Sequence, residues 1–251
     1  MRRIGRVLLP VLFWLGVWQL AAAAVGQELL LPGPAAVGRR LLELAAGAVF
    51  WQTALASLLR IFGGLLLGVA LGALLAGLTA WVPLLDWVLT PAVKVVRATP
   101  VASFILLVYL WVERGRVPGL ISALMVLPVV WGNVTRGIAE TDPRLLELAR
   151  AYGFGRGRTL RRIYIPSVLP YFASGCRTAL GLAWKAGVAA EVLCQPQNAI
   201  GTQIYNTKYY LETPSLFAWT LVVIALSFLL EWAVGGLLRR AEGLELSLIH
   251  I

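Results

Sequence analysis

The chain has 251 residues, of which 59% are hydrophobic and 14% are charged. A soluble domain usually carries about 25% charged residues, so this composition excludes an ordinary soluble protein and indicates that a lipid bilayer is the solvent. The formal net charge of +10 raises the question of nucleic-acid binding, although basic membrane proteins usually owe such an excess to their cytoplasmic loops. The positions of the lysines and arginines decide between these interpretations.

The first uncharged stretch, Val7 to Val25, follows three arginines and is long enough to cross a bilayer. We interpret it as a first membrane span. A cleaved signal peptide is the alternative, because the basic start and the small residues Ala21 to Ala24 resemble a processing site. The mixed composition of Gly26 to Leu59 then predicts an extracytoplasmic turn followed by an interfacial amphipathic helix.

The second predicted span, Ile61 to Leu85, carries no charged residue. Within it Gly64, Gly68 and Gly72 recur at every fourth position, so small residues line one face of the helix. Such a groove lets the backbone of another helix approach closely. We expect these glycines to be packing positions, within one subunit or between two.

The third span, between Asp86 and Val112, is interrupted by prolines and charges. This pattern predicts a kinked or broken helix. Arg97 lies there between Pro91 and Pro100, where a cation beside freed backbone groups is suited to contact an anionic substrate. A structural pair with an acidic partner, or a position at the membrane interface, is the alternative for Arg97.

Three more spans are predicted at residues 117–135, 167–192 and 216–238. Lys185 and Glu191 lie six residues apart in the fifth span and do not share a helix face. Charged residues inside a membrane usually face protein or water. Both are therefore candidates for lining a substrate path, or for pairing with other helices.

Six spans place both termini on one side of the membrane. Lysines and arginines concentrate before the first span, in the loop 136–162 and after the last span, so we expect these three regions to be cytoplasmic. The basic excess is then a matter of orientation, and no nucleic-acid partner is expected. The final residues, Leu246 to Ile251, read like a translated sequencing adapter, which leaves 1–245 as the expected domain.

The residues of catalytic and metal chemistry are sparse. Cys176 and Cys194 lack metal-type spacing, and His250, the single histidine, falls in the adapter-like end. We expect no metal site and no membrane-embedded enzyme. An ion-coupled secondary transporter fits poorly, because Glu191 is the one carboxylate well inside a span. No phosphate-binding G-x-x-x-x-G-K-[ST] motif occurs, so we expect no ATP hydrolysis by this chain.

The loop between the fourth and fifth spans has the signals of ordered structure. Asp142 followed by Pro143 predicts the start of a helix. A flexible turn is expected from three glycines, Gly153, Gly155 and Gly157. A second amphipathic helix, Thr159 to Ile165, is then expected to end at Pro166. Binding to anionic lipid and docking onto a second subunit both account for such a loop.

Five residues of this loop have the spacing of a known signature: Glu147, Ala149, Gly153, Ile163 and Pro166. In this pattern the chain resembles the permeases of ABC importers, with apolar departures at Leu148 and Ile165. The resemblance covers most of the chain and is greatest to the nitrate, sulfonate and taurine branch. The resemblance also rests on four other segments: LLPGPAAV, SLLR from Ser57 to Arg60, RATP from Arg97 to Pro100, and AAEV from Ala189 to Val192.

The resemblance implies an all-α membrane protein with about six transmembrane helices and the type I (MetI-like) importer permease fold. It implies a multi-pass location in a bacterial inner membrane. It also implies that the loop, about 136–166, contains a coupling helix that docks on an ATPase, with Glu147 at the interface and Gly153 permitting the turn. Such a permease forms the path for a small solute and is no enzyme itself.

The resemblance also implies the partners. Two ATPase subunits would bind ATP and Mg, an extracytoplasmic binding protein would deliver the solute, and a second permease copy would complete the path within the membrane lipid. This chain would need no cofactor of its own. A sulfonate, nitrate or taurine-like anion is the expected solute, and a thiamine precursor or another small metabolite is the alternative.

Overall fold

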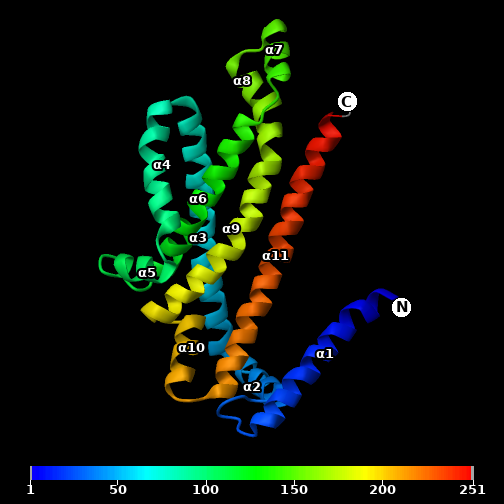
Figure 1. Ribbon diagram of the computed structural model, residues 1–251, viewed down its shortest axis with the longest axis vertical. Coiled ribbons are helices and arrows are strands. Elements are labelled where there is room, and N and C mark those ends of the chain that lie inside the picture. The colour runs from blue at the N-terminus through cyan, green and yellow to red at the C-terminus, as the bar shows by residue number, and fades with distance from the viewer. Residues whose placement is uncertain (1, 250–251) are drawn as a thin grey trace.

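The structure, a computed structural model, describes residues 2–249, with side chains for residues 8–238. Every element in this part of the chain is helical. The elements are α1 (Arg2–Val25), α2 (Pro34–Ala45), α3 (Ala48–Trp81), α4 (Pro83–Ala98), α5 (Val101–Tyr109), α6 (Val117–Ala139), α7 (Pro143–Ala151), α8 (Arg156–Thr159), a π-helix (Leu160–Tyr164), α9 (Ile165–Cys194), α10 (Ile200–Tyr209) and α11 (Thr213–Ile249). Figure 1 shows α7 and α8 at one end of the long helices, and α1, α2 and α10 toward the other.

The core is built on α3, α6 and α9, with α6 packed against both of the others. The glycines Gly64, Gly68 and Gly72 lie on the face of α3 that meets α6. A methyl group at Gly68 would come within 2.6 Å of the Ala123 carbonyl oxygen, and one at Gly72 within 2.8 Å of the Leu127 carbonyl oxygen. The two backbones are therefore in close contact, and the partner of the glycine groove is a helix of the same chain.

Four helical segments are long and apolar enough to cross a membrane: Leu8–Val25 in α1, all of α3, all of α6 and Thr213–Leu238 in α11. The helices α4 and α5 add a fifth if they are counted as one span, and they meet at a bend of 107°. The break falls at Thr99 and Pro100, since proline lacks the N–H that a continuous helix needs. The predicted break in the helix between Asp86 and Val112 is confirmed, whereas its crossing of the membrane remains a prediction.

The fifth predicted span corresponds to α9, a helix of 30 residues. It is not among the segments that are apolar enough to be recognised as spans, because Arg177, Lys185 and Glu191 lower its hydropathy. Much of α9 is nevertheless buried against α3 and α6. The total of six spans remains a prediction at this helix.

The predicted boundary near Leu59, between an interfacial helix and the second span, is wrong. A helix, α2, does form in this region, although its position at the membrane interface remains a prediction. It ends at Ala45, and α3 begins at Ala48 after Gly47 in an extended conformation. Arg60 therefore lies inside the long helix α3. A charge is a poor marker of a helix end when it has a buried partner, and Arg60 has one.

The predicted stop at Pro166 is also wrong. The chain passes from α8 through the π-helix directly into α9, and Pro166 lies in the first turn of α9. The wider π turn, closed by a hydrogen bond from the Ile165 amide to the Leu160 carbonyl, ends one residue before this proline. A proline is tolerated in the first turn of a helix, so it ends nothing here. Of the adapter-like residues, 246–249 continue α11, whereas His250 and Ile251 lie outside the described residues.

Candidate functional site

Two polar regions carry the functional predictions, one in the loop segment α7–α8 and one where α3, α9 and α10 meet. In the loop, Asp142 caps α7 as predicted, with its carboxylate accepting a hydrogen bond of 2.8 Å from the Arg144 amide. Pro143 takes the first helical position. This start signal fixes where α7 begins.

The end of α7 is set by Gly153. This glycine has φ +67°, in the left-handed region that favours glycine. The Phe154 amide donates to the Ala149 carbonyl at 2.8 Å and the Gly153 amide to the Arg150 carbonyl at 3.0 Å, which is the Schellman pattern. The predicted turn is therefore made at Gly153 alone, because Gly155 has a negative φ and Gly157 lies within α8.

The two faces of α7 differ in exposure. Ala149 is buried, and Ile163 of the following π-helix is buried as well. Three exposed apolar side chains, Leu145 (44%), Leu148 (54%) and Tyr152 (72%), share one side of the helix, and Glu147 is exposed on another side. An exposed apolar face on a helix that projects from the bundle is the feature that fits a partner groove.

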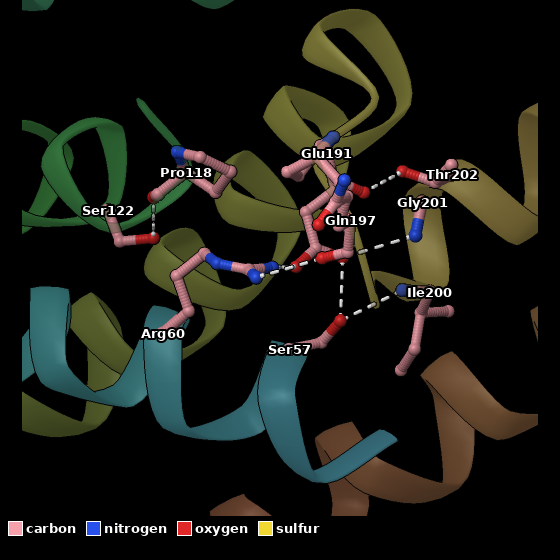
Figure 2. Close-up of polar contacts among 10 residues, drawn as sticks. Ser57, Arg60, Pro118, Ser122, Glu191, Gln197, Ile200, Gly201 and Thr202 are labelled. Atoms are coloured by element: carbon pink, nitrogen blue, oxygen red, sulfur yellow. Dashed lines mark hydrogen bonds and ion pairs between the residues drawn. The ribbon is translucent and has the colours of Figure 1, made fainter. Parts of the chain in front are cut away.

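The second region is centred on Glu191, whose side chain is completely buried (Figure 2). Arg60 of α3 forms an ion pair with it, with 2.8 Å between Nη1 and Oε1. Ser57, one turn earlier on α3, donates to the other carboxylate oxygen, Oε2, at 2.9 Å. Both oxygens of this carboxylate thus have strong partners, which a buried charge requires.

The same carboxylate and serine hold the start of α10. The Gly201 amide donates to Glu191 Oε2 at 3.1 Å, and the Ile200 amide donates to Ser57 Oγ at 2.8 Å. These N–H groups belong to the first turn of α10 and have no partner within that helix. Arg60 also donates to the Gln197 carbonyl at 3.2 Å, in the connection between α9 and α10. We call this set, Ser57, Arg60, Glu191, Ile200 and Gly201, the carboxylate network.

The predicted substrate-path residues are not brought together. Glu191 is enclosed in the carboxylate network, whereas Lys185 is exposed on α9. Arg97 is exposed in the last turn of α4, where its guanidinium donates to the Pro128 carbonyl of α6 beside Gly132. Its hydrogen-bond partner is therefore a carbonyl group and not the acidic side chain that a structural pair would need.

Sequence reasoning missed Arg60 and Ser57 as partners of Glu191. The signal was present, because SLLR and AAEV both belong to the resemblance, but nothing in the sequence joins segments more than 130 residues apart. Within the described residues, no group of three or more His, Cys, Asp or Glu side chains is placed to hold a metal ion.

Comparison with known proteins identifies the family. The profile described as "Binding-protein-dependent transport system inner membrane component" matches residues 64–243. The chain therefore belongs to this family: it is the inner-membrane, multi-pass permease component of an ABC importer for a small solute. Its ATPase and its binding protein are separate components, and the permease itself is not catalytic and, as is typical of the family, has no cofactor.

The individual relatives share less than 30% of their residues with this chain. The chain is 27% identical to the taurine transport system permease protein of Escherichia coli (strain K12), covering 94% of this chain and 87% of that protein. It is 26% identical to a putative aliphatic sulfonates transport permease protein of Bacillus subtilis (strain 168), over 93% and 85% of the two chains. It is also 29% identical to a riboflavin transport system permease protein of Chloroflexus aurantiacus, over 89% and 83%.

A solved structure supports the fold. The crystal structure of an amino acid ABC transporter with histidines superposes with a TM-score of 0.56 at 18% identity, covering 79% of this chain and 92% of that chain. At this identity the likeness concerns the fold alone. The fold is that of a type I importer permease, as predicted.

Proposed function

We propose that α7 is the coupling helix of this permease and that it docks on the ATPase subunit. The observation that carries the proposal is the exposed face of α7, where Leu145, Leu148 and Tyr152 follow the i, i+3, i+7 spacing of a helix that lies in a groove. Glu147 is exposed as well, on another side of the helix. The other signature residues have supporting roles: Ala149 and Ile163 seat the helix, Gly153 ends it, and Pro166 begins α9.

Charge reversal tests this proposal. Glu147→Arg is expected to reduce the co-purification of the ATPase at least tenfold, because an unfavourable charge in the interface costs more than about 1.4 kcal/mol. The matched control is Glu113→Arg, an exposed carboxylate between α5 and α6 and remote from α7. Equal ATPase recovery with both variants would contradict the docking role.

We further propose that the solute is a small anion such as a sulfonate, nitrate or a taurine-like compound. Two relatives are named for taurine and aliphatic sulfonates, and Arg97 on α4 and Lys185 on the core helix α9 are exposed cations. The alternative is a larger metabolite, since other relatives are named for riboflavin and formylaminopyrimidine transport. Direct ligand binding by the cognate binding protein, with taurine and riboflavin compared, distinguishes the two.

The arrangement in the membrane is also a proposal. We place both termini and the loop 136–162 in the cytoplasm, with residues 1–245 as one permease domain. We expect a second copy to complete the path, since nearly all of the apolar segment Leu8–Val25 is exposed, with only Ala22 buried within this chain. Cross-linking of detergent-solubilised permease gives the oligomeric state, and labelling of single cysteines introduced at 144 and 113 from either side of the membrane gives the orientation.

A further inference from the structure

A groove of about 890 Å³ lies between the loop segment and the ends of three long helices, and the function proposed above does not use it. Its walls include small and apolar residues of α3, α6 and α9: Ala73, Gly77, Val134, Ile138, Val168 and Phe172. The volume is in the range of small-molecule sites, roughly 300–1,000 Å³. The groove is therefore large enough for an elongated apolar ligand.

The end of the groove nearest the loop has a different chemistry. Arg150 at the end of α7 and Arg156 at the start of α8 both line it, and neither has an acidic partner among the described side chains. The lining of the groove contains no aspartate or glutamate. Trp81 and Tyr164 lie along the groove too, and such aromatic residues are typical of the level of lipid headgroups. The groove is thus apolar along the helices and cationic where the chain leaves them.

We propose that this groove, bounded by α3, α6, α7, α8 and α9, binds an anionic phospholipid. An acyl chain would lie against the apolar helix walls, and the phosphate would lie between Arg150 and Arg156. Basic pockets between membrane helices bind anionic headgroups in this manner. A soluble anion would leave the apolar walls exposed, and a zwitterionic lipid would bring no net charge to the two arginines.

The site also connects lipid to the loop. Leu146 and Phe154 of the loop segment line the same groove, so an occupied groove would support the inner side of α7 while the opposite face stays free. Lipid binding and docking on the ATPase therefore use different faces of one helix. The proposal depends on the membrane location of the chain and does not depend on the role proposed for Glu147.

Native mass spectrometry of the full-length permease, extracted from nanodiscs of phosphatidylglycerol or phosphatidylcholine, tests the proposal. Wild-type protein is expected to retain phosphatidylglycerol in preference to phosphatidylcholine. The Arg150→Gln/Arg156→Gln variant should retain it about 25-fold less well, at roughly fivefold for each arginine near the membrane surface. The charge-matched control, Arg144→Gln/Arg161→Gln, removes two arginines that do not line the groove and should retain phosphatidylglycerol like the wild type.

A second pair of variants tests the apolar half without changing charge. Gly77 lines the groove and has open space around its Cα, so Gly77→Leu fills the groove and should reduce phosphatidylglycerol retention at least fivefold. Gly63→Leu, at another open position of α3 outside the groove, is its control. Equal lipid retention by the variants and their controls, or equal retention of the two lipids, would overturn the proposal. So would a change of oligomeric state on Gly77→Leu with lipid retention unchanged, since a second copy would then occupy the groove.

Discussion

The carboxylate network and the segment α7–α8 are both rich in charged residues, but these residues differ in burial and in ion pairing. In the network, a fully buried carboxylate has partners for both oxygens, and all of them come from the same chain. In the segment α7–α8, the arginines and Glu147 are exposed, and no ion pair joins them among the described side chains. A charge that is satisfied internally holds helices together, whereas charges left open, beside exposed leucines, are available to other molecules.

The largest expected effect comes from breaking the buried ion pair. Arg60→Met leaves the Glu191 carboxylate buried without its cation, and the free energy of unfolding should fall by about 3–5 kcal/mol. Chemical denaturation of the purified permease in detergent measures it. Arg40→Met is the control, because its acidic partners, Glu43 and Glu212, are about half exposed and such pairs contribute about 0–1 kcal/mol. The buried Ser215 hydroxyl, which accepts from Arg40, keeps its hydrogen bond to Glu212 in this variant.

A double variant separates loss of the charge pair from loss of packing. In Arg60→Met/Glu191→Gln no buried charge remains, and the glutamine can still accept from Ser57 and Gly201. We expect this protein to be about 2 kcal/mol more stable than Arg60→Met alone. If the changes in the free energy of unfolding caused by the two substitutions are additive, the ion pair does not couple α3 to α9.

An intermediate effect is expected at the start of α10. A methyl group at Gly201 would lie 2.5 Å from the Val192 amide nitrogen and closer still to the Glu191 side chain, so Gly201→Ala forces α10 away from the carboxylate. Overpacking of this kind usually costs about 1–3 kcal/mol. Gly181→Ala, at an open position of α9, should be neutral in the same thermal unfolding measurement. Equal melting temperatures for the two variants would argue that α10 is not held by the network.

The smallest expected effect is in the loop. Gly153→Ala places a side chain at φ +67° and should cost about 1–2 kcal/mol, expressed as weaker ordering of the end of α7. Gly155→Ala is the control, because Gly155 has φ −68° and open space around it. Hydrogen exchange of the amides of α7 should be faster in the first variant and unchanged in the second. The same exchange rate in both would show that Gly153 is not the residue that ends α7.

The sequence permits prediction of those parts of the fold that depend on local chemistry. Asp142 and Pro143 mark the start of α7 because capping is a local interaction, and the proline-interrupted third span is indeed broken. The spacing of Gly64, Gly68 and Gly72 indicates a packing face, although the identity of the facing helix is a tertiary property. Apolar length alone locates four of the expected spans.

Two helix boundaries were predicted wrongly, one near Arg60 and one at Pro166. Arg60 looks like the end of an interfacial segment until its partner Glu191, 131 positions away, is known. Pro166 looks like a helix stop because local rules do not foresee a π turn that ends one residue before it. A distant ion pair accounts for the first error and a local turn for the second. The ion pair also shows that Glu191, a candidate path residue, is buried between helices.

The continuity through Pro166 has a mechanical consequence. Because α9 follows the π-helix directly, one helix of 30 residues, roughly 45 Å long and with Pro170 in its interior, joins the loop that carries α7 to Glu191 near its far end. A tilt of α9 imposed near the loop would shift Glu191, which binds α3 and α10. The two polar regions thus lie near the two ends of one helix. A movement of α9 would reach α3 and α10 through the contacts of Glu191.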